Sequence, residues 1–290
     1  MTELVDRYLN LLRDTLLNEL HVELEAQLVY AVLCASHGEV PDLERLAGAR
    51  DNRDLIAHLR QLKQDGDTLL LKGLDDQGHS RPDPTLRNHA EFAWTLIGHQ
   101  RMDHLRWCVE TVLDEGIPGD LLQAGVWRGG SAAFMRGVLA APGCQDRCLW
   151  VADSFQGLPV STAAADIGFE MDASVLPVLS VSLEDVRSLF KRLGLLDGQV
   201  RFLPGWFDTS LADQPDAPLA VLHIDADLYA STRVVLDHCY TRLAPGGFVI
   251  IDDYGILEPC REAVDEFRAQ HGLDAQLRQV GEHAIYWRVS

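Results

Sequence analysis

The chain has 290 residues, of which 47% are hydrophobic and 24% charged, and this composition excludes an intrinsically disordered protein. It holds 44 Asp and Glu residues against 25 Lys and Arg, which gives a net charge of −19. We therefore expect neither nucleic acid nor an anionic membrane as a partner, because both attract basic proteins.

The compartment is predicted from the N-terminus and the cysteines. The N-terminus has no basic stretch followed by an apolar run, and no run approaches the ~18 apolar residues of a membrane-spanning helix. The six cysteines are scattered, and the one close pair, Cys144 and Cys148, has no second pair at zinc spacing. The chain is accordingly predicted to be cytoplasmic, with reduced thiols.

Residues 1–89 are predicted to form a mainly helical N-terminal extension, because apolar residues recur at helical spacing. The expected elements are helices over 3–20 and 22–36, a short helix capped by Asp42, a longer helix capped by Asp51 or Asn52, a strand at 68–71 and a proline-bearing linker at 79–88. Helices followed by a hairpin suggest a winged-helix-like module, but the 12 acidic and 7 basic residues within 22–85 argue against DNA binding. We expect the extension to serve in oligomerisation or substrate docking, and we expect the protein to be a homo-oligomer.

From about residue 90 onward, short apolar runs alternate with helical segments. This alternation predicts a largely parallel α/β sheet, with residues 90–290 as one domain. The predicted helices cover 91–114, 130–140, 182–193, 231–243 and 258–270, and the predicted strands cover 120–124, 148–152, 200–203, 219–224, 248–251 and 284–289. Ligands of such sheets bind at the carboxyl ends of the strands, so the residues that follow each strand are the candidates for a site.

Two of these strand ends are typical of a nucleotide site. The first strand is followed by a glycine-rich turn, residues 125–130, that opens a helix, and the second ends at Asp153. A glycine turn lets a ligand approach the backbone, and an acidic residue after the second strand commonly binds ribose hydroxyls. The alternatives remain open at this point: the glycines can serve the turn alone, and Asp153 can be a helix cap.

Carboxylates follow two further strands, with Asp225 and Asp227 after one and Asp252 and Asp253 after the next. Adjacent strands place such side chains at one edge of a sheet, where they repel one another unless a cation binds. Mg²⁺ prefers oxygen ligands of this kind, so a metal site is favoured over solvent-exposed caps. His223 lies inside an apolar strand and is expected to be a core histidine. His99 and His104, in the predicted helix 91–114, are left as residues that can reach the site.

Together these residues resemble the macrocin O-methyltransferase family over about residues 91–288. The resemblance rests on eight blocks in order: Ala93–Gly98, Ile117–Asp120, Gly125–Gly130, Trp150–Pro159, Val181–Val186, Leu203–Phe207, Asp225–Tyr229 and Gly246–Gly255. It implies a Rossmann-like class I methyltransferase sheet of seven strands with the last antiparallel. It also implies S-adenosylmethionine (SAM) and Mg²⁺ as cofactors, and a hydroxylated small molecule, such as a sugar of an antibiotic, as the methyl acceptor.

The resemblance also implies roles for individual residues. The expected cofactor-binding residues are Gln123, Gly125, Val126, Trp127, Asp153, Ser154, Ser182 and Trp206. The expected metal ligands are Asp225, Asp252 and Asp253. Family members usually carry Glu where this chain has Gln123, which removes a charge available to the methionine ammonium. The segment 160–180 replaces a more charged family lid, and its Phe169, Met171, Val175 and Leu176 suggest a more apolar acceptor than a sugar. The alternative is that this segment is a variable surface loop.

Methyl transfer requires the acceptor oxygen to lie in line with the sulfonium methyl and to lose its proton. We expect Asp225 to be the base as well as a ligand, with Asp227 as the second candidate. Leu228 occupies the position of a catalytic Lys in the catechol-type enzymes, which excludes a Lys base there. Two rival interpretations are a SAM-fold binding protein without catalysis and a nicotinamide-dependent dehydrogenase, although the chain lacks the G-x-G-x-x-G fingerprint of the latter.

Overall fold

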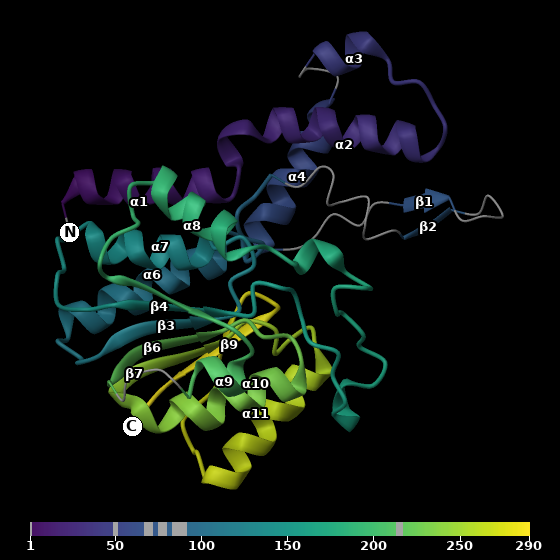
Figure 1. The fold of residues 1–290 in the computed structure, drawn as a ribbon. Helices are drawn as coiled ribbons and strands as arrows, with labels where there is room; N and C mark the ends of the chain where they lie inside the picture. Colours follow the sequence, from purple (N-terminus) through teal and green to yellow (C-terminus); the bar gives the residue numbers. More distant parts are fainter. Residues whose placement is uncertain (1, 49–51, 67–71, 75–79, 83–91, 213–216) are drawn as a thin grey trace.

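A twisted seven-stranded sheet forms the centre of the computed structural model, which describes residues 2–48, 52–66, 72–74, 80–82, 92–212 and 217–290 (Figure 1). The strand order is β5-β4-β3-β6-β7-β9-β8. The strands are β3 (Asp120–Ala124), β4 (Leu149–Asp153), β5 (Val200–Pro204), β6 (Leu219–Ile224), β7 (Leu243–Ile251), β8 (Arg278–Val280) and β9 (Ala284–Arg288). Strand β9 is antiparallel to both of its neighbours, whereas β5, β4, β3, β6 and β7 pair in parallel.

The register of the parallel strands aligns their carboxyl ends. Ala124 at the end of β3 is level with Ala152 in β4 and with Ile224 in β6, and Ile224 is level with Ile251 in β7. All six residues of β6 are buried, as expected for a central parallel strand that is covered on both faces. The residues that follow β3, β4, β6 and β7 therefore lie along one edge of the sheet.

Helices cover both faces of this sheet (Figure 1). On one face lie α6 (Gly98–Asp114), α7 (Gly130–Ala140) and α8 (Leu183–Arg192); on the other lie α9 (Phe207–Ser210), α10 (Tyr229–Cys239) and α11 (Glu258–His271). Each face has its own apolar core, the first containing Leu105 and Phe134, the second Val235 and Phe267. No helix in the described ranges is long and apolar enough to cross a membrane.

The N-terminal elements are α1 (Glu3–Leu16), the 3-10 turn Glu19–His21, α2 (Val22–Ser36), α3 (Leu43–Ala47), α4 (Arg53–Asp65) and the antiparallel pair β1 (Lys72–Leu74) and β2 (Ser80–Pro82). The winged-helix-like character of these elements stays a prediction. Helix α1, however, packs on α7, and its Leu9, Leu12 and Leu16 belong to the core of the sheet domain. The division at residue 89 stays a prediction, and α1 packs with the domain beyond it.

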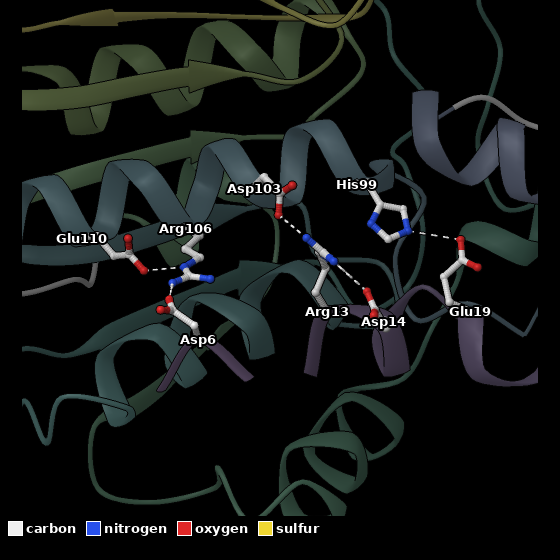
Figure 2. A network of polar contacts seen from close by, with 8 residues as sticks. All are labelled: Asp6, Arg13, Asp14, Glu19, His99, Asp103, Arg106 and Glu110. Atoms are coloured by element: carbon white, nitrogen blue, oxygen red, sulfur yellow. Dashed lines mark hydrogen bonds and ion pairs between the residues drawn. The ribbon is translucent and has the colours of Figure 1, made fainter. Parts of the chain in front are cut away.

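Ion pairs join α1 and the 3-10 turn to α6 (Figure 2). Arg13 bonds to Asp103 at 2.6 Å, Arg106 lies between Asp6 and Glu110, and His99 Nε2 lies 3.1 Å from Glu19 Oε1. Most of these side chains are partly exposed, so each pair contributes about 0–1 kcal/mol. These ion pairs between α1, the 3-10 turn and α6 therefore set the register of α1 on α6 more than they stabilise the fold.

Several expected boundaries were wrong. The helix predicted from residue 91 begins at Gly98, because residues 95–97 instead line the cavity described below. The helix predicted over 3–20 ends at Leu16, before Asn18 adopts a left-handed backbone with φ of 58°. The predicted strand 68–71 and most of the linker 79–88 fall outside the described residues, although 80–82 form β2. Strand β8 is missing from the predicted elements, because a strand of three residues shows too little alternation to be recognised.

Candidate active site

A cavity of about 490 Å³ opens at the carboxyl edge of the sheet. Residues after β3, β4, β5, β6 and β7 line it, together with Gly66 at the end of α4 and residues 95–97 before α6. Most of the predicted site residues meet in this lining, namely Gly125, Val126, Trp127, Asp153, Ser154, Trp206, Asp225, Asp227, Asp252 and Asp253. Residues predicted from their places at strand ends therefore share one cavity, and their individual roles stay predictions.

The turn after β3 requires glycine. Gly125 has φ of +85°, and a Cβ at this position would overlap the carbonyl oxygen of Asp225 in the neighbouring loop. Asp153 holds the same turn from β4: one carboxylate oxygen accepts from the backbone N–H of Val126 at 2.8 Å and the other from that of Phe155 at 2.7 Å. Burial raises the pKa of Asp153 even though these N–H groups oppose the shift. Asp153 therefore fixes two strand-end loops and still faces the cavity.

Two predicted cofactor residues, Gln123 and Ser182, lie outside the cavity lining. Gln123 is fully buried in β3, and its Nε2 donates to Ser131 Oγ at 2.6 Å and to the Gly125 carbonyl at 3.0 Å. Its Oε1 is buried and has no hydrogen-bond partner among the described residues. Ser182 is the N-cap of α8, where its hydroxyl accepts from the backbone N–H of Asp185. Neither side chain lines the cavity.

Strained backbone gathers at the same edge. Trp127, Phe155 and Asp227 have φ of 47°, 57° and 57°, in the left-handed region that non-glycine residues seldom adopt. They follow β3, β4 and β6, and conformations of this kind concentrate at functional sites because surrounding contacts must impose them. The Trp127 indole N–H also donates to the Val178 carbonyl at 3.0 Å, which attaches the turn to the β4–α8 segment, residues 154–181.

Three carboxylates form a compact cluster beside this turn. One oxygen from each of Asp225, Asp252 and Asp253 lies within 4.8 Å of the others. Burial and then the charges of Asp252 and Asp253 raise the pKa of Asp225 well above its ordinary value. Burial and Asp227 do the same for the pKa of Asp253. Such like charges held together in a buried place are stabilised by a hard cation with oxygen ligands, and this donor set fits Mg²⁺.

Asp252 differs from its neighbours because it has basic partners. Arg101 forms an ion pair with one of its oxygens, and His223 Nε2 lies 3.4 Å from the other. Burial would raise the pKa of Asp252, but Arg101 and His223 together hold that pKa below its ordinary value. His223 is a fully buried residue of β6, as its apolar surroundings predicted. Three carboxylates beside one paired arginine still leave an excess of negative charge.

A family model described as "Macrocin-O-methyltransferase (TylF)" matches residues 5–289. The chain belongs to the macrocin O-methyltransferase family. It is 48% identical over 215 residues to the 8-demethyl-8-(2,3-dimethoxy-alpha-L-rhamnosyl)-tetracenomycin-C 4'-O-methyltransferase of Streptomyces olivaceus, a match that covers 73% of this chain and 82% of that protein. It is also 48% identical over 210 residues to the mycinamicin III 3''-O-methyltransferase of Micromonospora griseorubida, covering 70% and 81%.

Among solved structures, the O-methyltransferase NovP superposes with a TM-score of 0.69 at 40% identity, covering 80% of this chain and 88% of NovP. The protein is therefore a SAM-dependent O-methyltransferase with a class I sheet, as the sequence predicted. This assignment rejects both rival interpretations, the binding protein without catalysis and the nicotinamide-dependent dehydrogenase.

The cavity suits SAM in this macrocin-type methyltransferase. The Gly125 turn lines the cavity, helix α7 begins at Gly130 just after it, and Asp153 supplies a carboxylate at the end of β4. Trp206, 42% exposed, stands at the cavity wall between β5 and α9. The buried Gln123 oxygen is an acceptor next to the turn, but the amide carries no charge.

Sequence reasoning missed the basic and N-terminal parts of this site. Arg101 on α6 lines the cavity and contacts Asp252, and Gly66 of the N-terminal extension lines it too. The two histidines considered for this helix lie elsewhere: His99 faces Glu19 (Figure 2), and His104 packs against aromatic rings. The available signal was Arg101 itself, which lies three residues after the block 93–98. Predicting its burial, however, required knowing that α6 begins at Gly98.

Proposed function

We propose that the enzyme transfers the methyl group of SAM to a sugar hydroxyl of a small natural product, with Mg²⁺ held by Asp225, Asp252 and Asp253. The observation that carries this proposal is that the carboxylate cluster and the glycine turn share one cavity. The names of the two relatives above specify O-methylation at the 4' and 3'' positions, and the first names a rhamnosyl group. A sugar hydroxyl is therefore the acceptor most consistent with the family.

The residues divide the work by position. The turn at Gly125, Val126 and Trp127 binds the methionine part of SAM, and Asp153 and Ser154 bind on the ribose side. SAM supplies the electrophilic methyl group, and the cation orients and acidifies the hydroxyl. Asp225 is the proposed proton acceptor, and Asp227, at the same strand end and also in the cavity lining, is the second candidate.

The cavity wall is mostly apolar. Pro159, Leu179 and Ile256 belong to it, whereas none of the four apolar residues of segment 160–180 that first suggested an apolar acceptor does so. Aliphatic and aromatic walls favour an acceptor whose sugar is joined to an apolar aglycone, because burial of such a group from water is favourable. We propose a glycosylated apolar compound as the substrate class.

Mass spectrometry can test the reaction directly. The enzyme is incubated with SAM and an extract of its host, and a product that gains one methyl identifies the acceptor. The same assay after EDTA treatment, and again with Mg²⁺ restored, tests the metal. Full activity in EDTA contradicts the metal role, and calorimetric binding of NAD rather than SAM contradicts the whole assignment.

We further propose that the chain forms a homo-oligomer in the cytoplasm, with residues 1–89 contributing contacts. The outer faces of α1, the 3-10 turn and α2 expose Leu4, Leu11, Leu20 and Leu24. All six cysteines are free, which suits a reducing compartment. Light scattering of the wild-type chain and of a variant with Leu4→Glu and Leu11→Glu tests the assembly; a monomeric wild type contradicts it.

A further inference from the structure

Arg101 connects the carboxylate cluster to the N-terminal extension. It is only 7% exposed, and its Nη1 pairs with Asp252 Oδ2. Its Nη2 donates to the carbonyl of Gly66 at 2.9 Å and to that of Leu96 at 3.2 Å, and its Nε donates to that of Ile97 at 2.7 Å. One guanidinium thus joins the end of α4, the segment before α6 and a carboxylate of the active site.

The backbones meet closely where α4 ends against α6. Gly66 follows α4 with φ of +77°, and a Cβ there would lie 2.5 Å from Arg101 Nη2 and 2.6 Å from the Ile97 carbonyl oxygen. A Cβ on Gly98 would overlap the Cα of Gly66. Any side chain at Gly66 must therefore displace Arg101 or the backbone before α6.

Helix α4 is itself anchored within the extension, where it descends from α2 toward the sheet domain (Figure 1). Lys63 Nζ lies 3.0 Å from Glu25 Oε2, and Asn18 Nδ2 donates to the same oxygen at 2.8 Å, with Lys63 and Glu25 both nearly buried. Ile56 and Leu59 pack against α2. A displacement of α2 and α4 therefore reaches Gly66 and its bond to Arg101.

We propose that Arg101 is a positioning residue that holds the Asp252 carboxylate in the cluster and couples its position to the docking of α4. The extension then takes part in catalysis by completing the wall and the electrostatics of the active site. This inference rests on the cation site proposed above, and it assigns residues 53–66 a role distinct from oligomerisation.

The sign of the effect distinguishes positioning from simple electrostatics. A positive charge near a cation site repels the cation, so removing Arg101 would strengthen cation binding if charge were its only contribution. Removing a residue that orients a ligand weakens binding, typically by about 10–100-fold. Lys keeps the charge but cannot bond to three carbonyls and a carboxylate at once, so Arg101→Lys should also weaken binding.

Mn²⁺ is the probe, titrated into S-adenosylhomocysteine-loaded protein and followed by electron paramagnetic resonance of the free ion. Arg101→Lys and Arg101→Met should each weaken Mn²⁺ binding at least about tenfold. Arg136→Met is the matched control, because Arg136 is a buried arginine of α7 paired with Asp197 away from the cluster. It should bind Mn²⁺ within about twofold of wild type, by the additivity of distant sites.

Glycine substitutions test the same junction from the opposite side. Gly66→Ala should weaken Mn²⁺ binding as the Arg101 variants do and should speed tryptic cleavage after Lys63. Gly38→Ala is its control, because Gly38 has a similar φ of +68° in the same extension but nothing within 4 Å of its Cβ position. Gly38→Ala has the same backbone cost and should leave both measurements at wild-type values.

The outcomes test the proposed cation site and the role of Arg101 separately. A wild-type protein that binds no Mn²⁺ overturns the proposed cation site and this inference with it. A wild type that binds Mn²⁺, with Arg101→Lys or Gly66→Ala unchanged or tighter, overturns the inference alone. If Arg101→Met does not fold, Arg101→Lys and Gly66→Ala decide, with S-adenosylhomocysteine affinity confirming that each variant is folded.

Discussion

Asp166 and Tyr229 lie 63 positions apart, yet a carboxylate oxygen of Asp166 accepts from the backbone N–H of Tyr229 at 2.6 Å. Its other oxygen accepts from the N–H of Ala230 at 3.3 Å and from the Ser161 hydroxyl. Tyr229 begins α10, which follows the loop of Asp225 and Asp227, and the side chain of the N-cap residue Leu228 makes no capping hydrogen bond. The β4–α8 segment thus caps the helix that positions Asp225 and Asp227.

Asp166→Ala should lower the free energy of unfolding by about 1–2 kcal/mol, because two partly buried N–H groups at the start of α10 lose their acceptor. It should also increase protease cleavage within the β4–α8 segment. Urea denaturation and limited proteolysis measure the two effects. Ser161→Ala removes a bond to Asp166 but keeps both bonds to α10, so it should cost less. Equal losses in the two variants would contradict the capping role.

The sheet could be predicted from the sequence because parallel strands buried on both faces are continuous apolar runs. The runs at 120–124 and 219–224 match β3 and β6 residue for residue. Strand β8 and the residue at which α6 begins could not be predicted in this way. Three residues have no readable period, and the segment before Gly98 is irregular: it lines the cavity, and its Leu96 and Ile97 carbonyls accept from Arg101.

The site was predictable only where chemistry coincides with strand ends. Asp225, Asp252 and Asp253 follow strands directly, so topology brings them together. Arg101 and Asp166 act across the fold through contacts 151 and 63 positions away, and no local pattern encodes such partners. The assignment of individual cofactor residues stays a prediction, because it depends on how SAM lies in the cavity.

Neutralising the proposed base should abolish catalysis without abolishing cofactor binding. Asp225→Asn should lower the methyl-transfer rate by at least about 100-fold, because the acceptor hydroxyl loses its proposed base and the cation loses a proposed ligand. Calorimetry with S-adenosylhomocysteine should show nearly unchanged affinity. Asp237→Asn, an exposed carboxylate on α10 paired with Arg233, is the control and should retain full activity. If Asp227→Asn loses more activity than Asp225→Asn, the two proposed roles are reversed.

The amide of Gln123 should be required for stability. In Gln123→Glu the carboxylate cannot donate to the Gly125 carbonyl and meets it as a second buried acceptor. We expect the free energy of unfolding to fall by about 1–3 kcal/mol, measured by urea denaturation. Gln156→Glu adds the same charge at an exposed position near the site and should be nearly neutral. A more stable Gln123→Glu protein with tighter SAM binding would show instead that the family's usual Glu fits here unchanged.

His104 should make the fold sensitive to acid. Its ring packs against Trp107 and Tyr286, with Nε2 3.6 Å from Cys108 Sγ. Burial, and then the nearby His223, lower the pKa of His104 from 6.5 to about 4. The unfolded chain therefore binds this proton more readily than the folded one, and the resulting stabilisation is complete above pH 6.5 and is lost as the pH falls toward 4.

The loss attributable to His104 is about 3 kcal/mol between pH 7 and pH 4, since each unit of pKa shift corresponds to about 1.4 kcal/mol. His104→Gln should remove this part of the pH dependence, so its unfolding free energy should fall less over that range than that of the wild type. Urea denaturation at several pH values measures both curves. His37→Gln, at an exposed helix end, should follow the wild-type curve. Parallel curves for wild type and His104→Gln would show that the ring is protonated in the fold without cost.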